Sequence, residues 1–524
     1  MVTLSLLALI VTSLSIVVFL NNNSKMNMGN MTNTDMNNQN VIDSAIPLST
    51  HSYAENIISP KPGQPIKKFD LIAMEGTNEI RKGEFKPIWG YNGKVPGQEI
   101  RVTQGDFVEV TLKNTLPDPV TIHWHGYPLN SAMDGVPGLN QDAVRQGESF
   151  TYKFSADIPG TYWYHSHQEG SKQVDKGLYG ALIVEPKSVQ LPDKDFTLIL
   201  DEWSESNEGM ESMEGMGSSA KTFDSAEEAS LAEEESMKDM YNIYTVNGKS
   251  GELIQPLDVN TGDLIRLRFI NAGYRSHTLH IPGTNIKVVS SDGQDINGAQ
   301  VIKDKLITIS PGERYDIEFT VERPESFSID FHDKNKFNDQ IKIPVYVDGN
   351  HQNVSNEESK ELELLDFTKY GTPSEGTFST EQNYDVTFNI DLGIKLKDGS
   401  LKYTINGDTF DELPPLKVTK DQLVQLTYTN KSDVDHPMHL HGHFFQVIAK
   451  NGVAVTGATM SKDTLLIKPK DSYTIAFKAD NPGNWVQHCH ELHHAAGGMM
   501  QKIEYIDFKS NYTPDPKNTF NNPE

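Results

Sequence analysis

One fifteen-residue pattern recurs three times along the chain and sets the strongest limit on its fold. Each copy has a turn in its middle, then apolar residues at every second position, then a closing asparagine. Alternation with a period of two indicates a half-buried β-strand. The copies start about 158 residues apart, which is the size of a β-sandwich with long loops. We therefore predict an all-β chain of three sandwiches in series, each carrying one copy: IRVTQGDFVEVTLKN (100–114), LDVNTGDLIRLRFIN (257–271) and LKVTKDQLVQLTYTN (416–430).

A second repeat joins only the first and third units. ADIPGTYWYHSHQ (156–168) and ADNPGNWVQHCHE (479–491) align without a gap, and Ser166 stands where the second copy has Cys489. The middle unit lacks this motif. This unit keeps His277 and His280 at the spacing of His436 and His439, but Pro282 replaces the histidine that would correspond to His441. We predict that the middle unit has lost a metal site and that its two histidines are packed or hydrogen-bonded.

The histidines of the chain are clustered. Twelve of the 17 lie in four short segments, and the single cysteine lies inside one of them. Histidines at positions i and i+2 of a strand share one face, so each His-x-His pair can direct two imidazoles to one site. Clusters in matching units predict metal binding, and the segments are HWH (123–125), HSH (165–167), HPMHLHGH (436–443) and HCHELHH (488–494).

The ligand types point to copper. Several imidazoles with one thiolate and a nearby thioether suit a blue-copper electron-transfer site. Zinc would usually bring more cysteines or a carboxylate. A nucleophilic role for Cys489 is the alternative, but the flanking histidines supply no clear pair of base and orienting group.

With these four segments in this order, the chain closely resembles the three-domain multicopper oxidases, which include laccases and bacterial cuprous oxidases. The resemblance covers roughly residues 60 to 508. It implies three cupredoxin-like Greek-key β-sandwiches and four copper ions: one type 1, one type 2 and two type 3. It also implies an enzyme that oxidises a donor at the type 1 copper, one electron at a time. The trinuclear cluster of the other three ions would reduce O2 to water with four electrons.

The resemblance assigns the ligands position by position. The type 1 copper would take His436, Cys489 and His494, with Met499 rather than Met500 as the axial thioether. The type 2 copper would take His123 and His439. The six type 3 ligands would form two sets, His125, His165 and His490 on one side and His167, His441 and His488 on the other.

Three residues are predicted to take part in electron or proton transfer. Electrons would enter through the edge of His494 and leave through Cys489, whose neighbours hold the type 3 coppers. Asp134, in MDGVPG, matches the acidic position that would supply protons, although an Asp-Gly pair also forms turns. The family often places a glutamate directly after the last type 1 histidine. Here that position is Ala495, and Glu491 is not an equivalent substitute.

The remaining histidines have plainer expectations. We expect His443 and His493 to support neighbouring ligands or to lie at the surface. We expect His51, His332 and His351 to be exposed to solvent.

The N-terminus predicts export. Residues 2–20 carry no charge, and this stretch is long enough to span a bilayer once as a helix. Residues 1–20 are therefore expected to be a signal peptide or an uncleaved anchor. Residues 21–60 lack aliphatic periodicity and are predicted to be an Asn- and Met-rich tether. The location would then be extracytoplasmic, either anchored or secreted. The expected domains follow at 61–190, 191–355 and 356–508, and 509–524 forms a C-terminal tail.

Charge and methionine content suggest the electron donor. The formal net charge is −26 with no basic stripe, which argues against a nucleic-acid partner. An acidic insert at 204–240 in the middle domain carries five methionines, and the tether carries four more. Thioethers suit Cu(I) and carboxylates attract cations. Cu(I) oxidation in copper tolerance is therefore the first hypothesis. The alternatives for the function are laccase-like oxidation of phenols and aromatic amines, and a copper carrier without turnover. The alternative for the insert is a disordered solvated segment. The methionines are Met210, Met213, Met216, Met237 and Met240 in the insert and Met26, Met28, Met31 and Met36 in the tether.

Overall fold

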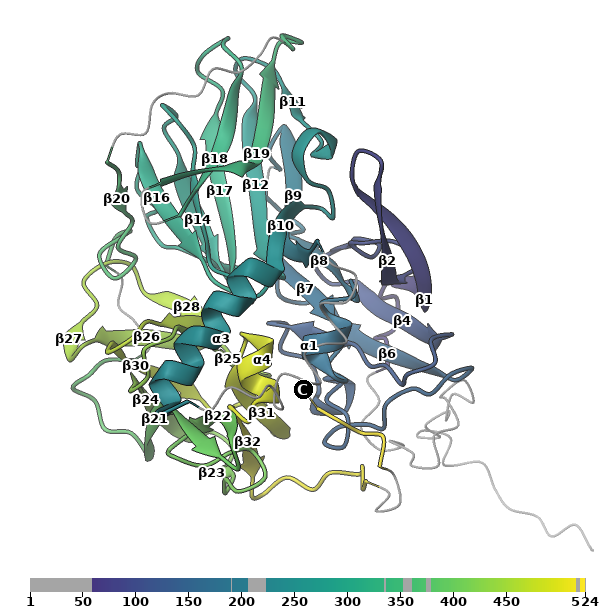
Figure 1. Ribbon diagram of the computed structural model, residues 1–524, viewed down its shortest axis with the longest axis vertical. Coiled ribbons are helices and arrows are strands. Elements are labelled where there is room, and N and C mark those ends of the chain that lie inside the picture. The colour runs from purple at the N-terminus through teal and green to yellow at the C-terminus, as the bar shows by residue number, and fades with distance from the viewer. Residues whose placement is uncertain are drawn as a thin grey trace, which may run out of the picture. The chain divides into compact units, whose positions relative to one another are not determined.

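The computed structural model describes residues 59–189, 191–205, 223–333, 336–351, 361–373, 378–514 and 519–523. Within them the chain is built from β-strands arranged in three sandwiches (Figure 1). The all-β prediction and the cupredoxin-like class are confirmed. No helix in these ranges is long and apolar enough to cross a membrane. The described residues leave out 1–58, which hold the uncharged stretch 2–20, His51 and the four methionines of the tether, and they leave out Met210, Met213 and Met216.

Each sandwich has two sheets. In the first, one sheet has the order β2 (Glu84–Tyr91), β1 (Ile66–Arg81), β4 (Phe107–Asn114) and β6 (Ser149–Ser155). The facing sheet has the order β3 (Ile100–Thr103), β8 (Tyr179–Glu185), β7 (Gly160–His165) and β5 (His123–His125).

The middle sandwich pairs two six-stranded sheets. The first has the order β10 (Tyr241–Val246), β9 (Lys194–Ser204), β12 (Leu264–Asn271), β17 (Arg314–Thr320), β14 (Lys287–Ser291) and β15 (Gln294–Asp295). The second has the order β11 (Leu257–Val259), β19 (Lys336–Val347), β18 (Phe327–Asp333), β13 (His277–His280), β16 (Lys305–Ile309) and β20 (Glu363–Leu364). Since β20 pairs with β16, the middle sandwich takes in residues beyond position 355, where we expected the third domain to begin.

The third sandwich repeats the plan. One sheet has the order β22 (Ser400–Ile405), β21 (Val386–Lys397), β24 (Leu423–Asn430), β30 (Ser472–Lys478), β26 (Phe445–Lys450) and β27 (Val453–Ala454), with β28 (Met460–Lys462) also on β26. The other has the order β23 (Leu416–Val418), β32 (Met500–Tyr505), β31 (Asn484–Cys489), β25 (His436–Leu440) and β29 (Thr464–Ile467).

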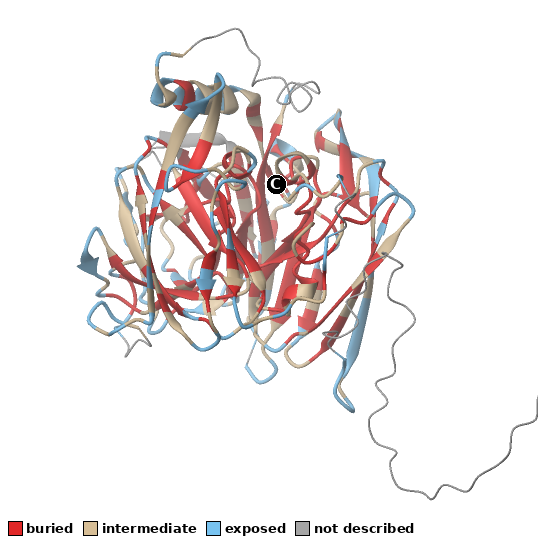
Figure 2. Cartoon of the chain, turned by 90° about the horizontal axis from the view of Figure 1, so that it is seen from below, coloured by how far each residue is buried: buried red, intermediate tan, exposed pale blue. Residues whose placement is uncertain are grey.

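The recurring pattern marks the place where the chain crosses between the two sheets of a sandwich. Its first half is a short strand in one sheet (β3, β11 or β23), and its second half is a strand in the facing sheet (β4, β12 or β24). Apolar side chains of both sheets meet in one core per sandwich, which Figure 2 shows as the buried stretches of the strands.

The closing asparagines explain why the pattern is so regular. Asn114, Asn271 and Asn430 are all buried, and each donates from Nδ2 to the carbonyl of the residue four positions later, at 2.7 Å. Each also donates to a second carbonyl, at 2.8, 3.0 and 2.9 Å respectively. A buried amide with several hydrogen bonds fixes the loop that follows it. In every sandwich this loop leads to the strand that carries histidines.

Helices are few and short among the described residues. They are η1 (Ser131–Met133), α1 (Gly170–Gln173), α3 (Ala226–Met240), η3 (Gly251–Leu253) and α4 (Leu492–Ala496). The longest, α3, occupies the second half of the acidic insert, so that half is not disordered. Ser225 caps α3 by accepting from the backbone N–H of Glu228 at 3.1 Å, and glutamates in the first turn favour the positive end of the helix dipole.

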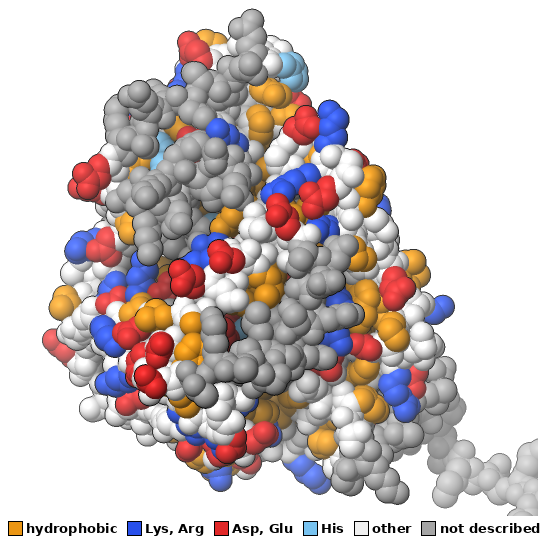
Figure 3. All heavy atoms as spheres, viewed as in Figure 1, with side chains coloured by type: hydrophobic (Ala, Val, Ile, Leu, Met, Phe, Trp, Pro, Cys, Tyr) orange, Lys and Arg blue, Asp and Glu red, His pale blue; other side chains and the backbone are white. Residues whose placement is uncertain are grey.

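The C-terminal tail lies against the first sandwich. The Tyr512 hydroxyl donates to Asp142 at 2.7 Å, and the backbone N–H of Ala143 donates to Asn521 at 2.9 Å. Gln168, which directly follows the HSH segment, donates to the carbonyl of Phe520 at 2.9 Å. The tail therefore links the end of the third sandwich to the first. On the face in Figure 3, acidic and basic side chains are interspersed among the described residues.

Candidate metal centre

Eight of the predicted ligands meet in one buried cluster between the first and third sandwiches. They lie on or directly after β5, β7, β25 and β31, and none exposes more than 1% of its surface. One group of three with converging nitrogens, His167, His441 and His488, coincides with a predicted type 3 set. A second group joins His123 and His439 to His441. The rings of the other predicted type 3 set, His125, His165 and His490, have centroids 4.7–5.8 Å apart.

The ring nitrogens suit metal binding. Nδ1 of His123, His165 and His439 lies 2.9 Å from a backbone carbonyl, and Nε2 of each has no hydrogen-bond partner. A carbonyl on one nitrogen fixes the tautomer that leaves the other free for a metal. Burial, followed by the neighbouring imidazoles, lowers the pKa of His165 and His490 well below the usual range, so both rings stay neutral, as ligands must be. The buried nitrogens left without a partner are the observation that a bound metal would explain.

A second, smaller group is centred on Cys489, the residue between His488 and His490 in the sequence. Cys489 Sγ lies 3.7 Å from Nδ1 of His436 and 3.6 Å from Nδ1 of His494, and the two nitrogens are 3.2 Å apart. All three residues are buried. Because side chains alternate along β31, Cys489 faces this group while His488 and His490 face the cluster of eight. This is the arrangement predicted for the type 1 copper.

The two methionines after this segment occupy different places. Met499 is buried in the same apolar cluster as Cys489, and its carbonyl accepts from the Cys489 N–H at 3.0 Å. Met500 begins β32 and packs with Val136 and Val486 in another cluster. Met499, and not Met500, therefore shares the apolar cluster of Cys489.

Two aspartates hold the stacked rings of the larger cluster. Asp134 Oδ2 lies 2.8 Å from Nδ1 of His441 and its Oδ1 lies 3.2 Å from Nδ1 of His123, and these two rings stack at 3.9 Å. Asp463 lies in the same way beside His125 and His439, which stack at 3.8 Å. Asp134 thus contacts two of the predicted ligands.

Asp463 was missed in the sequence. Its segment, SKDTLL, matches no recognisable motif, and only the strand register reveals it. In that register Thr464 lies opposite His439 on β25 and β29, so Asp463 is at the edge of the cluster. Knowledge of the β25–β29 pairing would have been the signal.

In the middle sandwich, His277 and His280 stand at the spacing of His436 and His439, but both lie against carboxylates. His277 Nε2 lies 2.5 Å from the buried Glu202, and His280 Nε2 lies 3.3 Å from Asp304. Pairing of β13 with β18 places Phe331 opposite Leu279, just as Cys489 is opposite Met438 in the third sandwich. The prediction of packed or hydrogen-bonded histidines is confirmed.

Of the other histidines, one departs from expectation. His332 is buried, with its ring 5.6 Å from that of His280, so the prediction that it is exposed is wrong. It lies on β18, an inner strand of its sheet, where the alternation of the strand turns it inward. His351 is exposed as predicted. His443 is buried and bonds the Tyr505 hydroxyl at 2.6 Å, which is the supporting role expected of it.

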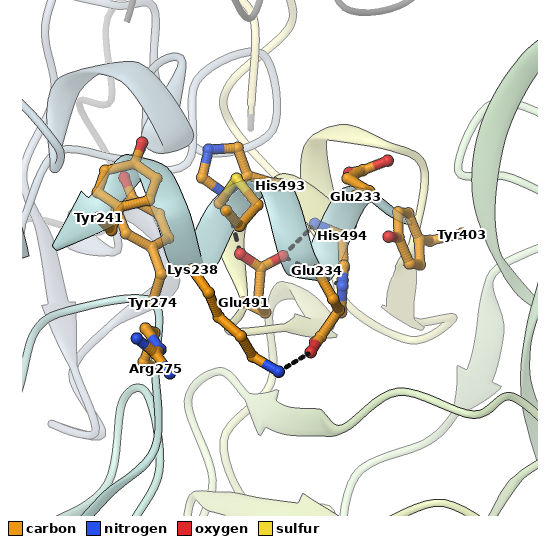
Figure 4. A pocket seen from close by; sticks show the side chains of 11 residues that line it. Glu233, Glu234, Lys238, Tyr241, Tyr274, Arg275, Tyr403, Glu491, His493 and His494 are labelled. Atoms are coloured by element: carbon orange, nitrogen blue, oxygen red, sulfur yellow. Dashed lines mark hydrogen bonds and ion pairs between the residues drawn. The ribbon is translucent and has the colours of Figure 1, made fainter. Parts of the chain in front are cut away.

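A pocket opens beside His494, under α3 (Figure 4). Glu491 lies at its base, where one carboxylate oxygen is 2.9 Å from His493 Nδ1 and the other accepts the His494 N–H at 2.8 Å. Burial would raise the pKa of Glu491, but the adjacent His494 and His493 lower it to about 2. The ring of Tyr403 stacks on His494 at 3.9 Å. From α3, Glu233, Glu234, Met237 and Lys238 complete this side of the pocket.

Comparisons with known proteins agree with this geometry. Three family models described as multicopper oxidase match residues 73–189, 194–351 and 377–507. The multicopper oxidase MmcO of Mycobacterium tuberculosis is 30% identical over 79% of this chain and 82% of its own length. A copper resistance protein A homologue of Pseudomonas syringae pv. tomato is 23% identical over 85% of this chain and 94% of its own.

Solved structures show the same fold. Fet3p, described as a multicopper oxidase that functions in iron import, has a TM-score of 0.71 at 23% identity, covering 86% of this chain and 93% of its own. A laccase of Pediococcus acidilactici has a TM-score of 0.64 at 24% identity, covering 87% and 95%.

Proposed function

This chain belongs to the multicopper oxidase family, and from that premise we propose that it oxidises Cu(I) and passes the electrons to O2. Members of the family bind four copper ions and couple a reducing substrate to O2. The chain is therefore an oxidoreductase, and the alternative of a carrier without turnover is set aside. Bound copper supplies the electron transfer and the O2 chemistry, and the protein supplies the ligands, their orientation and the donor site.

We assign the ligands as the sequence predicts. The group of His436, Cys489 and His494, with Met499, would hold the type 1 copper, and the eight clustered histidines would hold the other three. Cys489 is bonded through the backbone to His488 and His490, so the covalent path between the two sites is a few bonds long. His494 borders the pocket, which makes its ring the point of electron entry.

In this proposal the pocket under α3 determines which electron donor is oxidised. Glu233 and Glu234 face a cavity that already contains Glu491 at its base, and Met237 adds a thioether (Figure 4). Burial, followed by the charge of Glu491, raises the pKa of Glu233 to about 7. A soft cation would relieve this charge and would find a thioether ligand.

The cations of the pocket offset only part of this charge. Lys238 pairs with Glu234 at 3.6 Å, and Arg275 lies over the ring of Tyr244 at 5.5 Å. His493 is held by Glu491 and packs on Tyr274 at 4.6 Å. Three carboxylates beside the entry ring favour a cationic donor over a neutral phenol. The position of the acidic helix over His494 is thus the single observation that carries the proposal.

Neutralising the pocket should separate the donors. We expect the variant Glu233→Gln/Glu234→Gln/Met237→Leu to lose about tenfold or more in kcat/KM for Cu(I), which corresponds to about 1.4 kcal/mol of lost cation binding. Oxidation of a phenol should stay the same or rise, because neutral donors do not use these charges. Steady-state rates with Cu(I), Fe(II) and a phenol measure the effect.

Glu235→Gln/Asp239→Asn is the matched control, since it removes two charges from exposed positions of the same helix. It should leave Cu(I) oxidation unchanged. Equal Cu(I) rates in the pocket variant and the wild type, with fast phenol turnover, would favour the laccase-like alternative. A loss confined to Fe(II) would assign the pocket to iron instead.

Changing the axial thioether should tune the type 1 site. We expect Met499→Leu to raise its reduction potential, because a weak donor that stabilises Cu(II) is removed. Met500→Leu should leave the potential unchanged, since that side chain packs in another cluster. Redox titration of the blue absorption gives both values, and an effect of Met500→Leu alone would reverse the assignment.

We also propose an extracytoplasmic location with residues 1–20 as signal or anchor. The support is the uncharged stretch 2–20, and fractionation of cells expressing the full chain tests it.

A further inference from the structure

Asp463 lies where ligands from two sandwiches meet. Its Oδ1 is 3.2 Å from Nε2 of His125 and 3.5 Å from Nδ1 of His439. Its backbone carbonyl accepts from His439 Nδ1 at 2.9 Å. The Thr464 hydroxyl, 3.0 Å from His125 Nε2, completes the contacts between this turn and the stacked rings. One turn of the third sandwich therefore sets the orientation of a ring from the first sandwich and a ring from its own.

A residue of the middle sandwich holds this aspartate. Arg314, the first residue of β17, donates Nη1 and Nη2 to the two carboxylate oxygens of Asp463, at 2.7 and 2.6 Å. Its Nε donates to the carbonyl of Thr161 at 3.1 Å and its Nη1 to that of Gly312 at 3.1 Å. Both members of the pair are fully or almost fully buried. A paired fork of this kind fixes the carboxylate in direction as well as in position.

The backbone closes tightly on the pair. A Cβ at Gly126 would lie 2.2 Å from Arg314 Nη2 and 2.4 Å from Asp463 Oδ2. A Cβ at Gly312 would lie 2.9 Å from Cγ of His490 and 3.1 Å from Cε1 of His125. Both positions have φ near +80°, at +78° and +84°, which also favours glycine. The loop before Arg314 thus touches the histidine rings directly, and the pair has no room to shift.

The surrounding charges keep both groups ionised. Lys462 lies 3.0 Å from Asp292 and 3.1 Å from Glu313, and Asp292 accepts from the Arg314 backbone N–H at 2.9 Å. Burial opposes ionisation of Asp463, but the facing Arg314 holds the pKa of that carboxyl well below its usual range. The carboxylate is therefore available as an acceptor for both imidazoles.

We propose that Arg314 acts through Asp463 as a positioning residue of the trinuclear copper centre, so that the sandwich without copper sets the geometry of ligands in the other two. This rests on the ligand assignment made above for His125 and His439. Among its described residues, the middle sandwich contributes no group of converging metal ligands. Its contribution is to lock the first and third sandwiches in the relative position that lets their rings share metal ions.

A matched pair of variants tests the proposal. Arg268 is also a buried arginine of the middle sandwich, with a two-point pair to Asp195 at 2.7 Å and a bond to Asp316 at 2.9 Å. No histidine is among these partners. Arg314→Met and Arg268→Met each break a buried ion pair of the same sandwich, so general destabilisation is common to both. Arg314→Lys keeps the charge and loses the fork, and it decides the question if Arg314→Met does not fold.

Copper content and electron paramagnetic resonance are the readouts, beside activity. We expect both Arg314 variants to keep the blue type 1 signal but to bind the other coppers about 10- to 100-fold more weakly, with an altered type 2 spectrum, as when other groups that orient ligands are changed. The folded Arg268→Met variant should bind as much copper as the unaltered chain. Full copper with a wild-type spectrum in both Arg314 variants would overturn the proposal, and so would the same selective loss in Arg268→Met. Failure to bind any copper in the unaltered chain would instead overturn the ligand assignment.

Discussion

Replacement of Cys489 by serine should abolish both the blue colour and substrate oxidation. The colour of a type 1 site comes from the bond between copper and a thiolate, and a serine hydroxyl does not ionise to replace it. The residue is the single cysteine of the chain and is buried against His436 and His494. Electrons would then have no route to the cluster of eight histidines. Visible absorption and O2 uptake measure the two losses.

The fold and the other coppers should survive this change. Serine is smaller than cysteine and fills the same place on β31, and the eight clustered histidines converge on one another, whereas Cys489 groups with His436 and His494. About three copper ions per chain should therefore remain, with an intact type 2 spectrum. A Cys489→Ser variant that stays blue, or one that still oxidises Cu(I), contradicts the assignment.

Asp134→Asn should slow the reduction of O2 by about 10- to 100-fold, the usual cost of changing a group that orients metal ligands. The carboxylate Oδ2 lies 2.8 Å from Nδ1 of His441, and Oδ1 lies 3.2 Å from Nδ1 of His123. An amide can accept only through its oxygen, so one ring N–H would face the donor side of the amide. Reduction of the type 1 copper by substrate should be unaffected. Stopped-flow reoxidation of the reduced enzyme by O2 separates the two steps.

Two comparisons sharpen this test. Asp142→Asn is the control, because Asp142 bonds Tyr512 and Asn521 of the C-terminal tail. The loss in Asp134→Asn should be the same at every pH if the residue only orients ligands. It should grow as pH rises if Asp134 also delivers protons, since other sources become scarce. Unchanged reoxidation would show that Asp134 has neither role.

Much of this site could be predicted because the chain repeats itself. His123, His280 and His439 each stand nine residues after a closing asparagine, and in each sandwich the asparagine holds the loop between them. Local spacing therefore determines where this histidine of each unit lies. Strand alternation then determines the face of the others, so the ligand segments could be found from sequence alone.

The supporting residues could not be found in this way. Asp463 and Arg314 lie 149 positions apart and meet only because β17 and the turn before β29 pack at the boundary of two sandwiches. No periodicity encodes such a contact. In the same way, the composition of 204–240 indicated metal handling but did not show where in the fold this segment lies. The place comes from α3 packing beside β10, β21 and β22, next to His494 (Figure 1).

Oxygen uptake with Cu(I) as the only donor tests the central claim most directly. The unaltered chain, fully loaded with copper, would be compared with Cys489→Ser as the blank for uncatalysed oxidation. Because reduction of O2 to water takes four electrons, we predict that four Cu(I) ions are oxidised for each O2 consumed, without release of hydrogen peroxide. Cu(I) oxidation no faster than in the blank, while a phenol drives rapid O2 uptake, would contradict the account.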